Sequence, residues 1–272
     1  MPFTVSHVAA VLPAHRWLSR WHVFSAAVIG SMVPDFGVMM RGAYYDRWRT
    51  HSLPGLFEFC LPVGLLTYAL VLFLIKPALV EILADGPYAR LRASDAATPP
   101  PDGWRWCLIM LALLGGAITH LIWDGFTHEN APGVRMFPML EELGPEIDGH
   151  PLHVWRWLQY GSSLAGLVVV VAALIIWLRH APAPPSLPSR RLQSRERRFW
   201  VCLYLAFPLM YLAITVWQLC RSASMSLGSG AVLGTVLYAA MRATTLSLLA
   251  VSLLLRFRLR RDPQTQRRID RT

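Results

Sequence analysis

Five long runs of apolar residues constrain this chain more than any other feature. The runs cover residues 56–75, 106–123, 161–177, 199–219 and 231–255. Each approaches the length of about 20 residues with which a helix crosses a hydrocarbon core roughly 30 Å thick. None alternates apolar and polar residues over about ten positions, as strands of a membrane β-barrel do. The sequence therefore predicts an all-α fold, a polytopic transmembrane helical bundle of five or six spans.

The composition also indicates lipid as the solvent, because 54% of the 272 residues are hydrophobic and only 15% are charged. The apolar segment 23–40 leaves the number of spans open, since Pro34 and Asp35 interrupt it. No small-residue cleavage site follows it convincingly, so we expect it to be retained and not removed as a signal peptide. If it crosses the membrane, the chain has six spans. If it lies along the interface or re-enters, which Gly30 and Pro34 permit, the chain has five.

The basic residues behind the net charge of +10 concentrate in the 179–198 connection and in the 256–271 tail. Loops rich in arginine stay in the cytoplasm, so both segments are placed inside and the more acidic 128–155 loop outside. We expect membrane lipids as partners, with anionic head groups at the basic segments, and no nucleic acid.

Prolines mark the clearest division of the chain, at Pro182, Pro184, Pro185 and Pro188. Proline fixes its own backbone angle and has no amide hydrogen, so this connection is predicted to be a stiff linker. We predict an N-terminal helical membrane domain over 1–180, a cytoplasmic linker over 181–198, two transmembrane helices within 199–256 and a basic cytoplasmic tail over 257–272.

Ionisable residues are costly near lipid, so those beside or inside a span indicate a functional site. His120 and Asp124 lie four residues apart near the end of the second long run, and His128 lies one turn further. On a helix, His120 and Asp124 project from one face and can share a metal ion. Asp35 and His51 border the 41–51 loop on the same predicted side of the membrane. We therefore expect them at the same depth.

Mixed nitrogen and carboxylate ligands suit zinc, and also iron or manganese, so the sequence predicts a divalent metal site from these residues. The alternative is that each histidine is hydrogen-bonded to a carboxylate and only holds helices together.

Four short motifs add a resemblance to this interpretation. They are Met1-Pro-Phe-Thr-Val-Ser-His7, Gly30-Ser-Met-Val-Pro-Asp35, Thr50-His51-Ser-Leu-Pro-Gly55 and His120-Leu-Ile-Trp-Asp124. Together they resemble a family of bacterial polytopic membrane proteins catalogued as a domain of unknown function, over most of the chain. The resemblance implies a multi-pass location in the bacterial cytoplasmic membrane.

A looser similarity runs to membrane-bound metal-dependent hydrolases and to zinc-dependent phospholipase C enzymes, which have a comparable order of histidines and aspartates. It implies six metal ligands: His7, Asp35, His51, His120, Asp124 and His128. The further downstream ligands of those enzymes have no clear match, although His150 or Glu146 can be proposed. Inclusion of His7 favours five spans, because a crossing segment 23–40 would separate His7 from Asp35.

Two functions follow from these residues. The first is a metal-dependent hydrolase that acts on a phosphoester or a lipid-like substrate at the membrane surface, with Asp35 or Asp124 as catalytic groups that bridge two ions or act as general base. The second is a non-catalytic scaffold or transport component, in which the same polar residues are structural.

Overall fold

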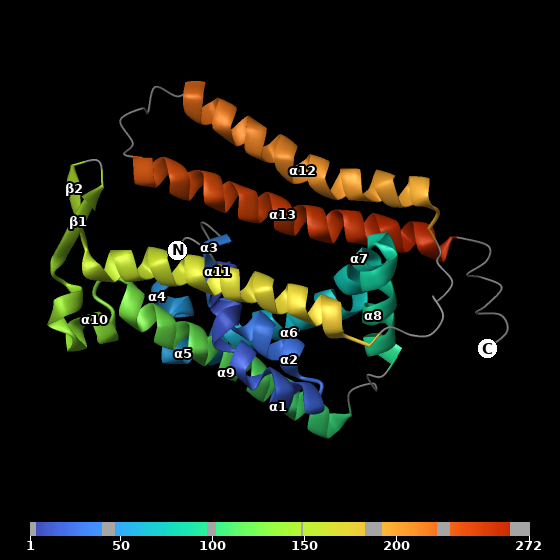
Figure 1. Cartoon of the computed structure of the whole chain (residues 1–272), viewed down its shortest axis with the longest axis horizontal. Coiled ribbons are helices and arrows are strands. Elements are labelled where there is room, and N and C mark those ends of the chain that lie inside the picture. The colour runs from blue at the N-terminus through green and yellow to red at the C-terminus, as the bar shows by residue number, and fades with distance from the viewer. Residues whose placement is uncertain are drawn as a thin grey trace. The chain divides into compact units, whose positions relative to one another are not determined.

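The computed structural model describes residues 4–39, 47–96, 102–147, 149–182, 192–221 and 229–261. In these residues, five helices are long and apolar enough to cross a membrane (Figure 1). They cover Leu53–Ile82, Gly103–Thr127, Val154–His180, Ser194–Arg221 and Thr235–Arg260. Each contains one of the five apolar runs or most of it, which confirms the predicted all-α class and makes the chain a multi-pass membrane protein.

The N-terminal segment forms short helices and no span. They are η1 (Thr4–Ala10), η2 (Leu12–Ala14), α1 (His15–Arg20), α2 (Phe24–Gly30), η3 (Val33–Asp35), α3 (Phe36–Met39) and α4 (Arg47–Thr50). The seven residues of α2 rise only about 10 Å, a third of the hydrocarbon thickness. Pro34 lies at the start of η3, where its fixed backbone angle is tolerated. Among the described residues, five helices are able to span a membrane and none lies in this segment, which agrees with the alternative of five spans.

The first spanning helix is continuous from Leu53 to Ile82. It consists of α5 (Leu53–Gly55), a π-helical turn η4 (Leu56–Cys60), α6 (Leu61–Leu70), a second π-helical turn η5 (Val71–Ile75) and α7 (Lys76–Ile82). Its first turn is capped by Ser52, whose Oγ accepts a hydrogen bond from the amide of Gly55 at 3.1 Å. This cap fixes the position of the chain immediately after His51.

The second and third spans are α9 (Gly103–Thr127) and α11 (Val154–His180). Asp102 caps α9 by accepting a hydrogen bond from the amide of Arg105 at 2.8 Å. Between the two spans lie α10 (Pro132–Met136), η6 (Pro138–Leu140) and an antiparallel hairpin of β1 (Leu143–Ile147) and β2 (His150–His153). The sequence predicts only a loop here. Gly149 allows the hairpin to turn, because its φ of +76° is strained for other residues.

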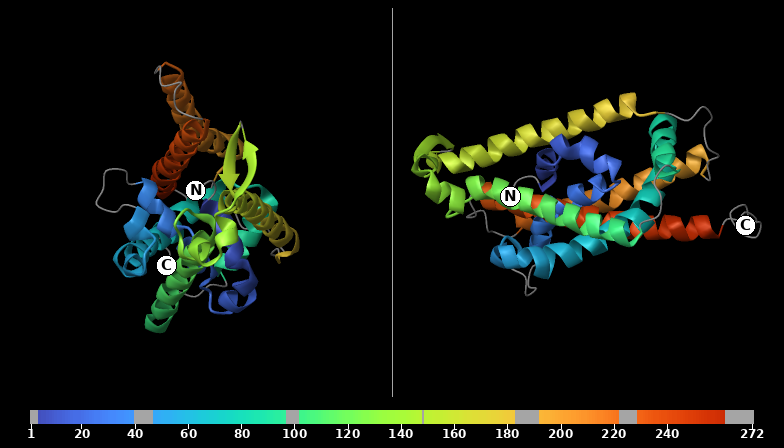
Figure 2. Two further views of the ribbon diagram at one scale, coloured as in Figure 1. Left: turned by 90° about the vertical axis from the view of Figure 1, so that its left-hand side faces the viewer. Right: turned by 90° about the horizontal axis from the view of Figure 1, so that it is seen from below.

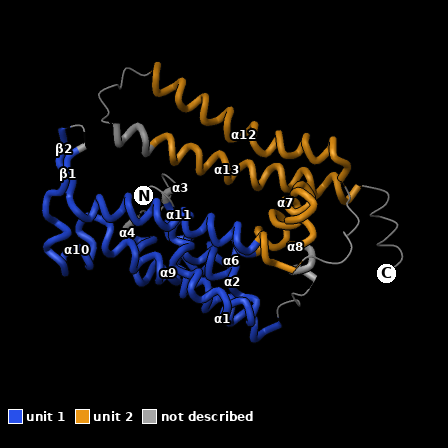
Figure 3. The backbone as a smooth tube through the Cα atoms, viewed as in Figure 1, with its two compact units in different colours: residues 1–68, 100–177 blue, residues 69–99, 178–272 orange. Residues whose placement is uncertain are grey.

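The chain divides into two compact units (Figure 3). Unit 1 comprises residues 1–68 and 100–177, and unit 2 comprises residues 69–99 and 178–272. Residues 69–99, which include α7 and α8 (Asp85–Ala96), are grouped with the C-terminal helices in unit 2. Residues 183–191 of the predicted linker lie outside the described residues, as does the tail beyond Arg261.

Unit 2 is built on α12 (Ser194–Arg221) and α13 (Ser229–Arg260), which pack against each other and against α7. Its core contains the buried apolar side chains of Ala78, Leu192, Trp200, Val251, Leu255 and Leu259. Tyr204 joins the two long helices, since its hydroxyl and that of Ser252 are hydrogen-bonded at 2.8 Å and its carbonyl oxygen accepts from Ser247 at 2.9 Å.

In unit 1, α1 and α2 lie between α9 and α11, in dark blue between green and yellow (Figures 1 and 2). Two glycines allow α2 and α9 to approach closely. A side chain at Gly30 would overlap the backbone of Leu113, and one at Gly116 would overlap the carbonyl oxygen of Ala27. Small residues commonly serve this purpose between membrane helices.

Candidate metal centre

Four ligand-type side chains from distant parts of unit 1 meet at one point. Asp35, His51, His120 and Asp124 each offer one nitrogen or oxygen atom, and these atoms lie within 4.8 Å of one another. Asp35, His120 and Asp124 are buried, and His51 is nearly so. The four residues that the sequence placed at one depth are therefore in mutual reach.

The distances between these atoms resemble those of a four-ligand metal site. Nε2 of His51 lies 3.4 Å from Oδ1 of Asp35 and 3.4 Å from Oδ2 of Asp124. Nε2 of His120 lies 3.4 Å and 3.5 Å from the same two oxygens. A tetrahedron with metal–ligand bonds of about 2.0 to 2.1 Å has edges of about 3.3 to 3.4 Å. The four nitrogen–oxygen spacings therefore suit a small divalent ion, and the remaining two spacings among the four ligand atoms are within 4.8 Å.

Each of these side chains is positioned by local structure that the sequence explains. Asp35 ends the proline-initiated turn η3, and His51 is held between the end of α4 and the Ser52 cap of α5. His120 and Asp124 are one turn apart on α9, so they project from the same face of that helix.

Hydrogen bonds on the side away from the centre orient the ligand atoms of His120 and Asp35. Nδ1 of His120 donates to the carbonyl oxygen of Ser31 at 2.7 Å, because a carbonyl can only accept. This bond leaves Nε2 of a neutral His120 with a free lone pair that faces the carboxylates. Thr4 donates from Oγ1 to Oδ2 of Asp35 at 2.7 Å, which turns Oδ1 of Asp35 towards the centre.

His7 and His128 lie beside this group. Both contact Oδ1 of Asp124, the carboxylate oxygen that does not contact His51 and His120. Nε2 of His7 is 3.6 Å and Nδ1 of His128 is 3.3 Å from Oδ1 of Asp124. The His7 ring stacks on that of His120 with centroids 3.8 Å apart, and the amide of Gln159 contacts Nε2 of His128 at 2.6 Å. All six residues implied by the resemblance are thus gathered, four around one point and two on the far oxygen of Asp124.

The electrostatics of the group favour a cation. Burial alone would raise the pKa of Asp35, but the neighbouring His120 and His51 hold that pKa well below its usual range, so Asp35 is ionised. Burial would lower the pKa of His51, but its close contacts with the carboxylates of Asp124 and Asp35 raise it overall. Burial lowers the pKa of His7 to about 4, with a further contribution from His120. Two buried carboxylates therefore attract either a proton or a metal ion.

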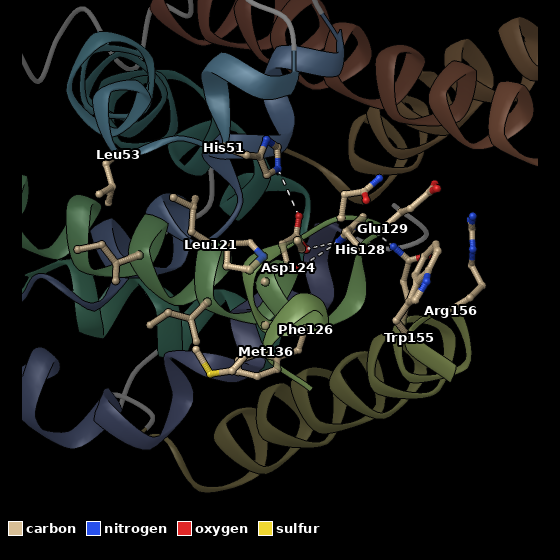
Figure 4. Close-up of a pocket in the computed structure, with 18 residues that line it drawn as sticks. His51, Leu53, Leu121, Asp124, Phe126, His128, Glu129, Met136, Trp155 and Arg156 are labelled. Carbon is tan, nitrogen blue, oxygen red and sulfur yellow. Dashed lines mark hydrogen bonds and ion pairs between the residues drawn. The ribbon is translucent and has the colours of Figure 1, made fainter. Parts of the chain in front are cut away.

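A cavity of about 790 Å³ opens beside the group (Figure 4). His51, Asp124 and His128 form part of its wall. Apolar residues of α9 and α10 and polar residues of α11 form much of the rest, among them Leu121, Ile122, Phe126, Met136, Arg156 and Gln159. Asp124 therefore belongs both to the buried group and to the wall of the cavity.

The two further ligands suggested by the resemblance are not part of the group. His150 and Glu146 lie on the strands of the hairpin, and both are exposed. The group found among the described residues contains neither of them.

Three supporting residues were missed by the sequence analysis. Thr4 stands in the opening motif three residues before His7, a position that could have indicated a role. Ser31 acts through its backbone carbonyl, and Gln159 lies on a different helix from His128, so no local pattern reveals either one.

These features define a multi-pass helical membrane protein with a buried group of two aspartates and two histidines that can hold a metal ion. The chain belongs to the family described as Domain of unknown function (DUF4184), which matches residues 1–253. This match confirms the domain of unknown function that the four motifs resemble. No curated protein and no solved structure matches the chain. The likeness to hydrolases and phospholipases rests on the order of residues alone.

Proposed function

We propose that this protein is a metal-dependent hydrolase that acts on a phosphoester in a lipid-like substrate at the membrane surface. The observation that carries the proposal is the set of four nitrogen–oxygen distances of 3.4 to 3.5 Å between the imidazoles of His51 and His120 and the carboxylates of Asp35 and Asp124. Zinc is the ion that best suits two nitrogen and two carboxylate ligands, and iron or manganese also fits.

Two buried atoms support the fit of an ion. Oδ1 of Asp35 and Nε2 of His120 form no hydrogen bond among the described residues, although both are shielded from solvent. They face each other at 3.4 Å. Buried polar atoms without hydrogen bonds are costly, and a shared ion would satisfy both.

A divalent ion supplies two things in such a site: it lowers the pKa of bound water towards neutrality, and it polarises a phosphoryl oxygen. Hydrolysis adds the oxygen of water to phosphorus and breaks the phosphorus–oxygen bond to the leaving alcohol. One proton must therefore pass from water to the alcohol oxygen. Asp124 or Asp35 is suited to transfer that proton as general base. In Asp124 the second oxygen, Oδ1, is oriented by His7 and His128 and lies away from His51 and His120.

The location of the group further supports a membrane substrate. His120 and Asp124 are near the C-terminal end of the spanning helix α9, so the group is expected at the boundary between lipid and water. From the loop charges we infer that this boundary lies at the outer face of the bacterial cytoplasmic membrane, which is part of the proposal.

A non-catalytic scaffold is the alternative, because the same residues also tie η1, η3 and α9 together through side-chain contacts. In that case, replacement of the four residues would lower stability without loss of a metal or an activity.

Metal analysis of the purified protein separates these functions. We expect at least one divalent ion per chain in the wild type and less than a tenth of that in Asp124→Asn and His120→Ala. Hydrolysis of a phosphodiester should fall about 1,000-fold, since both the ion and a proton-transfer group are affected.

His150→Ala is the matched control, because it removes an exposed histidine of the same unit and should retain the metal. Wild-type protein without stoichiometric metal, or a His120→Ala variant with unchanged metal content, would contradict the proposal.

A further inference from the structure

The cavity beside the metal group has a wall that faces the membrane. Ile118 and Ile122 line the cavity and are 44% and 58% exposed. Both lie on the spanning helix α9, where the environment of an exposed apolar side chain is lipid. A long apolar molecule can therefore pass between the bilayer and the cavity without contact with water.

The cavity is polar at its other end. In Figure 4, Leu53, Leu121 and Met136 lie on one side of His51 and Asp124, and Glu129, Trp155 and Arg156 lie on the other. The sequence positions agree, since Ile118 precedes Asp124 by six residues, about 9 Å along α9. The metal group thus lies between an apolar part and a polar part of the same cavity.

The polar part contains a cation suited to phosphate. The guanidinium of Arg156 lies 4.5 Å from the ring centroid of Trp155, which holds the arginine side chain in place at the start of α11. Guanidinium groups bind phosphate through two parallel hydrogen bonds. Gln159, also in the wall, adds an amide that can donate.

We infer that the cavity binds one membrane phospholipid, with an acyl chain along Ile118 and Ile122 and its phosphate between Asp124 and the guanidinium of Arg156. The cavity volume of about 790 Å³ lies within the range of about 300 to 1,000 Å³ that buries most of a small ligand. The inference rests on the proposed function for the reaction, but lipid binding itself requires no catalysis. It specifies a lipid that enters sideways from the bilayer.

Native mass spectrometry of delipidated protein with added phosphatidylglycerol tests this inference. We expect the wild type to retain one lipid and Ile122→Trp, which narrows the cavity, to retain it at least tenfold less. Leu111→Trp is the matched control, because Leu111 is 62% exposed on the same helix and does not line the cavity. It should retain lipid as the wild type does. Met136→Trp, in another part of the wall, replaces Ile122→Trp if that variant does not fold.

Arg156→Gln tests the orientation of the lipid. It should weaken retention of phosphatidylglycerol about tenfold and leave that of diacylglycerol, which has no phosphate, unchanged. Equal retention of phosphatidylglycerol in the wild type and in Ile122→Trp, or in Met136→Trp where that variant replaces it, would overturn the inference. An equal effect of Arg156→Gln on the retention of the two lipids would also overturn it. Metal content measured on the same samples separates the two ideas: specific lipid retention without metal refutes the hydrolase alone, and metal without specific lipid retention refutes this inference alone.

Discussion

The two units of this chain bury different kinds of polar residue. Unit 1 buries His7, Asp35, His120 and Asp124 side by side, with three of their contacts to one another between 3.4 and 3.6 Å. In the described part of unit 2, the buried polar residues are Glu81, Ser247 and Ser252, and the two serines only join α12 to α13. Both units are built from apolar spanning helices, so lipid as a solvent does not explain the difference.

This difference indicates where function resides. A hydroxyl between two membrane helices satisfies its hydrogen bond locally and contributes roughly 0.6 to 2 kcal/mol. A cluster of carboxylates and imidazoles is far more costly to bury, unless a proton or an ion compensates the charge. We therefore expect mutations near the cluster in unit 1 to lower the metal content of the protein. Mutations of the buried polar residues in unit 2 should change only the free energy of unfolding.

The largest effect is expected at the close contact of α2 with α9. In Gly116→Ala, the added Cβ overlaps the carbonyl oxygen of Ala27 and lies 2.7 Å from the amide nitrogen of Ser31. The helices must separate, so the free energy of unfolding should fall by about 3 kcal/mol and the metal should be lost as Ser31 moves from His120. Thermal unfolding in detergent and metal analysis measure both.

Gly115→Ala is the control for this variant, since nothing lies within 4 Å of a Cβ there. Equal behaviour of the two variants would show that the close approach of α2 and α9 does not hold the site together.

A smaller effect, confined to the metal, is expected from Thr4→Val. This change removes the hydroxyl that donates to Oδ2 of Asp35 but keeps the shape of the side chain. Loss of such a supporting hydrogen bond lowers metal affinity about 10- to 100-fold. Competition with a chelator of known affinity measures the change, and Thr4→Ser should restore most of it. A Thr4→Val protein with wild-type affinity would argue that Asp35 needs no orientation.

The smallest effect is expected in unit 2. Tyr204→Phe removes the hydroxyl that contacts Ser252, which should lower the free energy of unfolding by about 1 kcal/mol and leave the metal content unchanged. Tyr211→Phe on the same helix is the control, because the hydroxyl of Tyr211 forms no hydrogen bond in the described part of the chain. Loss of metal in Tyr204→Phe would break the distinction between the units.

Predictions based on local sequence agree with the structure at several points. The pair His120 and Asp124 shares a face of α9 because four residues make about one helical turn. The equal depth of Asp35 and His51 followed from their positions at the ends of apolar segments, and both lie 3.4 Å from partners in the α9 pair. The grouping of residues 69–99 with unit 2 was not predictable, because it depends on which distant helices α7 contacts.

The sequence by itself determined that this chain is a membrane protein with five or six spans and that several of its histidines and aspartates lie near one depth, because length, hydropathy and helical periodicity act locally. Only the tertiary structure decided that these side chains meet. The close approach of α2 to α9 at Gly30 and Gly116 brings Ser31 to His120. Because the N-terminal segment is divided into short helices, Asp35 and His7 also come into contact with His120. Such contacts join residues up to 117 positions apart (His7 and Asp124), and no local pattern specifies them.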